Sequence, residues 1–235
     1  MRLLEPHPDA FPADPPAHPD DPQAVAAHDW DAFSQVDKTT NHWERPGWTP
    51  DTRAYYWLLT MPSTAFGDQI PQLQHAINHL PYDPIPDDGI HLTLGRVGTE
   101  DTTTRTALYA LLNDARVDLP PAFTLTAVPI TASRGAVRYS VAPWTPLLTL
   151  HAHLARVTAA HRLGPMAPTS RLRPHIGVAY SASTRPAADI HAALAPMRAL
   201  PPVTLGVTAV ALVAMRREPG AYRWDVVAEL PLPRS

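Results

Sequence analysis

His91-Leu92-Thr93-Leu94 is the stretch from which the fold of this chain is best predicted, because it recurs in altered form as His175-Ile176-Gly177-Val178. Turn-forming residues precede both copies, Asp87-Asp88-Gly89 before the first and Arg173-Pro174 before the second, so each copy is predicted to be a strand. Side chains alternate along a strand, which puts the histidine and threonine of the first copy on one face and its leucines on the other. We therefore expect two proton-transfer groups, one from each half of the chain, to face each other across a cleft.

The elements around the two copies follow a similar order in each half of the chain. Apolar residues at three- and four-residue steps predict helices, and short apolar or aromatic runs between turn residues predict strands. The first half gives a strand at 54–60, a helix at 65–80, the first histidine strand, a helix at 99–115, and strands at 123–132 and 136–141. The second half gives a helix at 145–162, the second histidine strand, a helix at 187–200, and strands at 203–215 and 222–230. This order predicts an α+β fold built as a duplicated unit.

Composition limits the classes of protein to be considered. The 235 residues include no cysteine, which excludes disulfides and thiolate metal sites and fits a reducing compartment. The formal net charge of -3 argues against a protein that coats nucleic acid by neutralising phosphates. No stretch has the eighteen or so apolar residues of a membrane span. We expect no signal peptide and no membrane partner, and predict a cytoplasmic monomer.

The first fifty residues differ in composition from the rest. Residues 1–29 are rich in proline, aspartate and alanine without hydrophobic periodicity, and are predicted to be a disordered tail. An aromatic loop follows at 41–48, with two tryptophans, a histidine and an arginine. The loop either stacks on a base and covers the cleft, or shields an exposed edge of the core. The domain boundaries expected from the sequence are 1–50 for the tail and loop, and 51–235 for the bilobal domain.

The paired motif and the order of elements resemble the two-histidine phosphoesterase superfamily, in particular proteins labelled 2'-5' RNA ligase or RNA 2',3'-cyclic phosphodiesterase. The resemblance covers residues 53–230 and implies two antiparallel sheets that face a central cleft, with helices on the outside. It implies metal-free phosphodiester chemistry without a cofactor on 2',3'-cyclic phosphates of RNA ends or small nucleotides. One of His91 and His175 would be the general base and the other the general acid. Thr93 would donate to a phosphate oxygen, and Arg171 or Arg173 would stabilise its charge.

Gly177 departs from the family pattern, which has serine or threonine at this place. A hydrogen bond to a charged group contributes about 1.5–3 kcal/mol, so its loss corresponds to roughly ten- to a hundredfold in rate. Water, a backbone N–H that approaches the ligand at Gly177, or an arginine would have to replace the missing hydroxyl. The alternative function is a catalytically weak or inactive protein of this fold that binds RNA ends or nucleotides.

Three further residues are candidate substrate contacts, because they lie on or just after the predicted cleft strands. Tyr56 either lines the cleft or packs in the core, and Tyr180 and Ser181 follow the second histidine strand. His151 and His153 are two residues apart on a predicted helix and so point in different directions, which favours surface positions over a metal site. We expect no metal site, because hard-metal sites need clustered carboxylates with histidine. The sequence also has no P-loop, glycine-rich dinucleotide motif or His-Glu-x-x-His motif.

Overall fold

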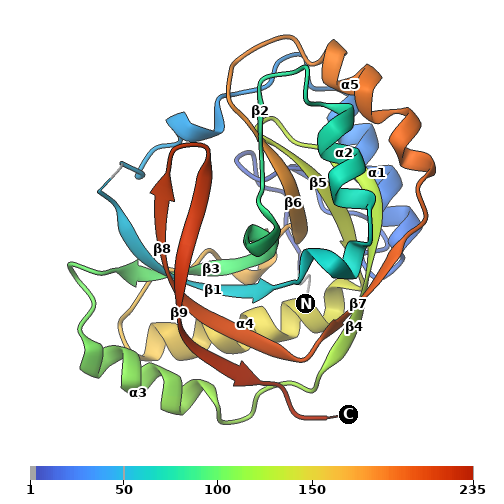
Figure 1. Ribbon diagram of the computed structural model, residues 1–235. Coiled ribbons are helices and arrows are strands. Elements are labelled where there is room, and N and C mark those ends of the chain that lie inside the picture. Colours follow the sequence, from blue (N-terminus) through green and yellow to red (C-terminus); the bar gives the residue numbers. More distant parts are fainter. Residues whose placement is uncertain (1–3, 50, 235) are drawn as a thin grey trace.

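Two antiparallel sheets carry the two histidine strands in the computed structural model, which describes residues 4–49 and 51–234 (Figure 1). The four-stranded sheet has the order β3 (His91–Thr99), β1 (Arg53–Thr60), β8 (Ala209–Glu218), β9 (Ala221–Pro231). The five-stranded sheet has the order β2 (Tyr82–Pro84), β6 (His175–Ser181), β5 (Ala136–Ala142), β4 (Phe123–Ala132), β7 (Val203–Val207). Each histidine therefore begins a strand of a different sheet.

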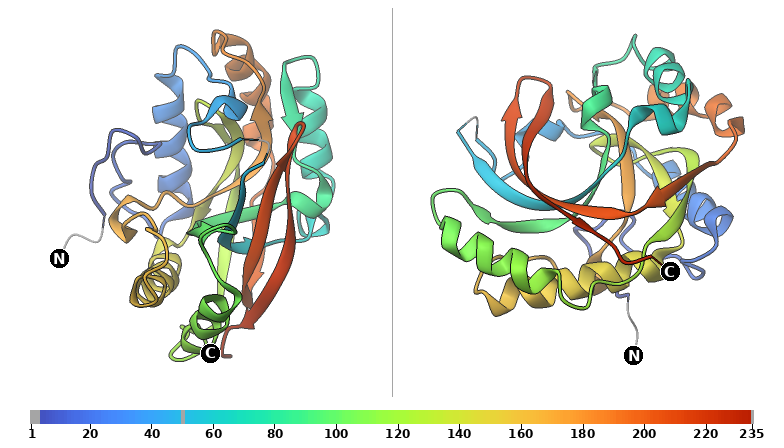
Figure 2. Two further views of the ribbon diagram at one scale, coloured as in Figure 1. Left: turned by 90° about the vertical axis from the view of Figure 1, so that its left-hand side faces the viewer. Right: turned by 60° about the horizontal axis from the view of Figure 1, so that its bottom comes forward.

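Helices pack against both sheets (Figure 2). The α-helices are α1 (Pro22–Ser34), α2 (Gln69–Ala76), α3 (Arg105–Ala115), α4 (Trp144–Ala160) and α5 (Ala188–Leu194). The short 3-10 helices are η1 (His42–Glu44), η2 (Ser63–Phe66), η3 (Asp87–Gly89), η4 (Thr169–Arg171) and η5 (Pro196–Ala199). Helix α4 meets the four-stranded sheet where the indole N–H of Trp57 donates to Thr158 Oγ1 at 3.2 Å. Helix α2 meets the five-stranded sheet where the hydroxyl of Tyr139 donates to Gln69 Oε1 at 3.1 Å. The predicted duplicated α+β fold with two antiparallel sheets is confirmed. One helix departs from the expected outside position, because α1 bonds to Ser140 of β5 on the face opposite to the one that α2 covers.

The predicted single strand at 203–215 is wrong, because the structure divides it between the two sheets. Val207 ends β7 opposite Phe123, whereas Ala209 begins β8 opposite Pro231. Most of the run is apolar and it contains no charged residue or proline, so its composition does not mark Thr208 as the place where the chain passes from one sheet to the other. The predicted helix at 187–200 is likewise shorter. Helix α5 ends at Leu194, two residues before Pro196, which has no N–H to continue the helical hydrogen bonds.

The predicted disorder of residues 1–29 also differs from the structure, which places helix α1 at Pro22–Ser34. The Asp21 side chain accepts from the backbone N–H groups of Gln23 and Ala24 and so caps the helix. The buried stripe of α1 is Val25, Ala26, Asp29 and Phe33. Asp29 interrupts this stripe with a charged side chain, so the apolar periodicity of the helix is hidden in the sequence. The partner that allows Asp29 to be buried is Ser140 of β5, which is 111 positions away and so could not be predicted locally. Residues 1–3 of the predicted tail lie outside the described residues.

No helix in the described ranges is long and apolar enough to cross a bilayer.

Candidate active site

Both histidines of the repeated motif are held in the same way. Nδ1 of His91 lies 2.7 Å from the carbonyl oxygen of Gly89, and Nδ1 of His175 lies 2.8 Å from that of Arg173. A carbonyl oxygen can only accept, so each neutral ring carries its proton on Nδ1 and leaves Nε2 as the acceptor. Because the anchoring carbonyl is two residues before the histidine in both cases, the two halves of the chain present equivalent Nε2 atoms as acceptors.

The two imidazoles lie close enough to interact electrostatically. Strands β3 and β6 are in contact although they belong to different sheets, and a charge on His91 lowers the pKa of His175. Burial is the main cause of the lowered pKa of both rings, and Arg138 adds to it for His175, whose pKa falls to about 3. His91 is only 9% exposed and meets the Trp224 ring edge-on, with centroids 5.1 Å apart. The unliganded site therefore holds both imidazoles neutral near pH 7.

Thr93 shares one face of the four-stranded sheet with His91. In the register of β1 and β3, His91 lies opposite Thr60 and Thr93 lies opposite Leu58, so both motif side chains point to the same side. Thr93 is exposed, and within the described parts of the chain its hydroxyl has no hydrogen-bond partner. Its hydroxyl is thus available to a ligand beside the first imidazole, and its contact with a phosphate oxygen stays a prediction.

Arg96 reaches the same face, a position that the sequence reasoning missed. Strict alternation would put a residue five positions after His91 on the opposite face. A register shift between Trp57 and Leu58 corrects this, and Arg96 lies opposite Tyr56. A β-bulge depends on the pairing of two strands, so no pattern within 91–99 alone could have shown that a cation shares a face with His91 and Thr93.

Gly177 lies on the same face of the five-stranded sheet as His175, but an apolar side chain occupies the space in front of it. A Cβ added at Gly177 would lie 2.7 Å from Ile85 Cδ1. Ile85 is 3% exposed, and its backbone N–H donates to the carbonyl oxygen of Val178 at 2.9 Å. Opposite Gly177 in the register stands Arg138 of β5. The two halves of the site are therefore unequal, with a hydroxyl beside His91 and a methyl group beside His175.

A buried ion pair borders the His175 side. Ser140, which lies opposite His175 in the register, donates to Asp29 Oδ2 at 2.6 Å. Arg138 Nη2 lies 4.0 Å from the same oxygen, and both partners are 2% exposed. Although burial alone would raise the pKa of Asp29, His28, Arg138 and Ser140 lower it, so the carboxyl group is charged. Arg138 Nε and Asp29 Oδ1 are buried without a hydrogen-bond partner among the described residues.

The two arginines predicted near the phosphate are used differently. Arg171 lies exposed on η4. Arg173 is 8% exposed and donates from all three of its guanidinium nitrogens to backbone carbonyl oxygens, those of Glu5, Pro12, Ala13, Ser170 and Leu172. These bonds make Arg173 a tether for the residues near the N-terminus, so it is not among the substrate contacts proposed below.

The three candidate contacts beyond the motifs are also placed unequally. Tyr180 is 8% exposed, and its ring stacks on His42 with centroids 4.2 Å apart. Tyr56 is partly buried beneath Trp48, with ring centroids 6.0 Å apart. The aromatic loop therefore covers tyrosines from both sheets. Ser181 is fully buried and donates to the carbonyl oxygen of Ser183, so its hydroxyl holds the turn after β6.

The described residues include no group of three or more histidine, aspartate or glutamate side chains arranged to hold a metal ion. His151 and His153 are buried, which corrects the expectation of surface positions. His151 Nδ1 bonds Thr169 Oγ1 at 2.8 Å, and His153 Nε2 bonds the carbonyl oxygen of Ala115 at 2.9 Å. They face different neighbours, as their spacing on a helix predicts.

Comparisons with known proteins agree with this architecture. The model of the 2'-5' RNA ligase superfamily matches residues 62–219. The structure of E. coli LigT complexed with NADP+ is similar at 20% identity and a TM-score of 0.56, over 78% of this chain and 99% of LigT. TT0787 of Thermus thermophilus is similar at 18% identity and a TM-score of 0.55, over 77% of this chain and 99% of that protein. No curated protein matches the sequence significantly. With a family match over most of its length, this chain belongs to the 2'-5' RNA ligase superfamily of two-histidine phosphoesterases.

Proposed function

We propose that this protein is a metal-independent phosphodiesterase that opens 2',3'-cyclic phosphates of nucleotides or RNA ends. The observation that supports the proposal is the matched anchoring of His91 and His175, which leaves an equivalent Nε2 on each of two strands that contact each other across the sheets. Superfamily membership supports phosphodiester chemistry in general. E. coli LigT has been solved with 3'-AMP, with ATP and with phosphate, which supports a nucleotide-sized phosphorylated ligand for the same fold.

The reaction needs one base and one acid. The neutral Nε2 of one histidine takes a proton from water while the water oxygen bonds to phosphorus. The bond from phosphorus to one ribose oxygen breaks, and the protonated Nε2 of the other histidine gives its proton to that oxygen. The products are a phosphate monoester and a free hydroxyl, and a proton transfer between histidines and solvent restores the starting state.

Electrostatics favours His175 as the base. Arg138 and His91 both oppose a positive charge on His175, whereas no cation is among the causes of the lowered pKa of His91. The residue that is harder to protonate is the better proton acceptor at the start of the reaction, and the bound phosphate would raise the pKa of its partner. We assign the acid to His91, beside which Thr93 and Arg96 lie on the same face to bind the phosphate oxygens.

The test is turnover of 2',3'-cyclic AMP by the purified protein in EDTA. His91→Asn and His175→Asn should each lower kcat by about a hundredfold or more, the usual contribution of general acid or base catalysis. His79→Asn is the matched control, because His79 is an exposed histidine that follows α2 and belongs to neither motif. Unchanged activity in the double variant His91→Asn/His175→Asn would disprove the proposal.

A second function is favoured by one observation, the Ile85 methyl group that stands where the family has a hydroxyl. A protein that lacks this donor would bind nucleotides or RNA ends and turn them over weakly or not at all. It would show saturable binding of cyclic AMP that both histidine substitutions abolish, with no phosphate monoester formed during long incubation.

A further inference from the structure

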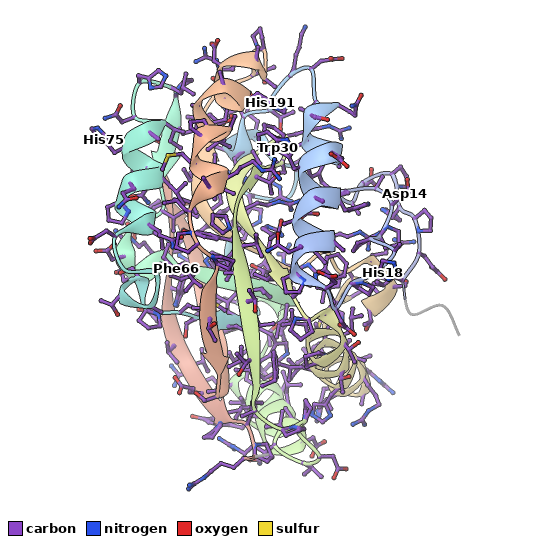
Figure 3. All side chains as sticks on the ribbon, turned by 90° about the vertical axis from the view of Figure 1, so that its right-hand side faces the viewer. Asp14, His18, Trp30, Phe66, His75 and His191 are labelled. Carbon is purple, nitrogen blue, oxygen red and sulfur yellow. The ribbon has the colours of Figure 1, made fainter. Side chains whose placement is uncertain are left out.

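Residues 4–48 are called here the N-terminal segment, and helix α1 of this segment lies against the face of the five-stranded sheet that carries His175. Ser140 and His175 are partners in the register, so their side chains leave the sheet on the same side, and Ser140 donates to Asp29 of α1. Helices α2 and α5 cover the opposite face, as the side views show (Figures 2 and 3). Helix α1 therefore occupies the face that carries the second catalytic histidine. The family match begins at residue 62, so this helix is outside the matched region.

The N-terminal segment also bonds to arginines of both halves of the chain. Arg173 donates to the carbonyl oxygens of Glu5, Pro12 and Ala13, and Arg138 donates to that of Phe11, whose ring lies 5.2 Å below the guanidinium. On the other sheet, Arg217 donates to the carbonyl oxygen of Trp43. Three arginines that would otherwise attract a phosphate backbone thus bind carbonyl oxygens of this segment.

The formal charge of the N-terminal segment also disfavours a phosphate backbone beside it. Between residues 4 and 48 there are nine acidic and two basic side chains, a formal charge of −7, whereas the rest of the chain has thirteen acidic and seventeen basic residues, a charge of +4. Asp14 is exposed on the N-terminal segment (Figure 3), and its charge stabilises the charged form of Arg173. A nucleic-acid groove needs positive charge along the phosphate backbone, and here a negative segment lies beside the histidines instead.

The end of the N-terminal segment joins the two sheets. Trp43 donates from its indole N–H to Asp83 of β2 at 2.7 Å, and its ring lies 5.4 Å from that of Tyr222 on β9. Trp48 lies 6.0 Å from Tyr56 on β1. The two sheets therefore meet through aromatic rings. In proteins that bind single-stranded nucleic acid, exposed aromatic rings stack on successive bases, whereas these rings pack against each other.

We infer that the N-terminal segment restricts the cleft to small cyclic phosphates of mononucleotide size and excludes an RNA chain. The inference rests on the proposed function and narrows its substrate. A mononucleotide brings one phosphate to the histidines. An RNA end brings the same phosphate together with a negatively charged backbone. On the face with His175 that backbone would meet the acidic helix α1, and the arginines nearby are already bonded to carbonyl oxygens.

The experiment compares kcat/KM of the full chain for 2',3'-cyclic AMP and for an oligoribonucleotide that ends in a 2',3'-cyclic phosphate. The mononucleotide should be preferred by about tenfold or more, since charge repulsion reverses the steering that speeds association. Raising the salt from about 50 mM to about 500 mM should narrow the preference, because it screens the repulsion. The variant Asp14→Asn/Asp31→Asn should narrow it too, while Asp101→Asn, an exposed acid outside the segment, should leave it unchanged.

The failures of the two proposals are distinguishable. Equal or faster turnover of the oligonucleotide, or turnover of it that falls steeply with salt, would overturn the size restriction and leave the phosphodiesterase function in place. Failure to turn over either substrate would overturn the phosphodiesterase function and the restriction with it. Preference for the mononucleotide with no response to salt or to Asp14→Asn/Asp31→Asn would contradict the electrostatic part of the argument.

Discussion

Ile85 fills the space in front of Gly177, because Ile85 Cδ1 lies 2.7 Å from where a Cβ of residue 177 would be. The same side chain also contacts Gly89, since its Cγ2 lies 3.1 Å from where a Cβ would stand there. Gly89 supplies the carbonyl oxygen that anchors His91. One isoleucine thus packs between the backbone that precedes the first histidine and the backbone that follows the second. The second motif therefore has glycine, and no hydroxyl, at position 177 because Ile85 occupies the space that a side chain there would need.

This relationship predicts a compensated substitution. Gly177→Ser alone should destabilise the fold by about 1–3 kcal/mol through overpacking, without a gain in rate. Ile85→Val removes the clashing Cδ1 and should cost about 0.5–1.5 kcal/mol by itself. In Gly177→Ser/Ile85→Val the two losses should not add, and the new hydroxyl should raise kcat/KM up to about tenfold or a hundredfold. Urea unfolding and kinetics of the unaltered protein, the two single variants and the double variant measure both effects. If the losses of unfolding free energy in the single variants simply add in the double variant, the packing argument is contradicted.

The pH dependence of activity should be displaced to acid. For the free enzyme, kcat/KM is greatest between the pKa values of the acid and the base, and burial lowers both histidine pKa values below 6.5. We expect the optimum of kcat/KM below pH 6.5, with a decline towards pH 8 as the acid loses its proton. The optimum of kcat should be higher, because bound phosphate favours the protonated ring. A kcat/KM optimum above pH 7 would argue against the proposed pair.

Folding stability should also fall in acid. Burial lowers the pKa of His42 and of His175 to about 3 and that of His151 to about 4. Between these values and 6.5 the unfolded chain binds more protons than the native one, so stability is complete above pH 6.5 and decreases as the pH falls. Each such histidine contributes a slope of about 1.4 kcal/mol per pH unit.

Urea unfolding at pH 7 and pH 5 measures this slope. His42→Phe keeps a ring against Tyr180 and cannot take up a proton, so it should reduce the slope by one histidine. The exposed His79→Asn serves as its control and should leave the slope as it is. A slope that is unaffected by His42→Phe would show that this histidine is not held neutral.

Arg173 should behave as a tether for the N-terminal segment. Arg173→Gln removes hydrogen bonds to five carbonyl oxygens and should cost at least about 2 kcal/mol, since bonds from a charged donor contribute about 1.5–3 kcal/mol each. Limited proteolysis followed by mass spectrometry should detect faster cleavage between residues 5 and 20. Arg171→Gln, two positions away and exposed, is the control and should be cleaved like the unaltered protein.

The local pattern of the sequence was sufficient for much of the fold. Strand β4 has the predicted bounds 123–132, and α4 buries the predicted stripe of Leu147, Leu150, Leu154 and Val157. These elements follow from residues a few positions apart, because the helical and strand periods repeat over short distances. The same periodicity placed His91 and His175 on two strands in equivalent settings, and the prediction that they act as a catalytic pair stays a prediction.

Contacts between distant residues decided the rest. Arg96 shares a face of the sheet with His91 because of a bulge in the pairing of β1 with β3. Ile85, which follows β2, contacts Gly177 of β6. The acidic, proline-rich start of the chain has no apolar stripe of its own that would predict a helix. It is ordered because Arg138, Ser140 and Arg173, all beyond residue 130, satisfy Asp29 and the backbone carbonyl groups of the segment. The sequence by itself determined the repeated strands and their histidines, whose positions depend on local alternation. Only the tertiary structure decided what shares the cleft with them, because those contacts depend on register and on packing between segments far apart in the chain.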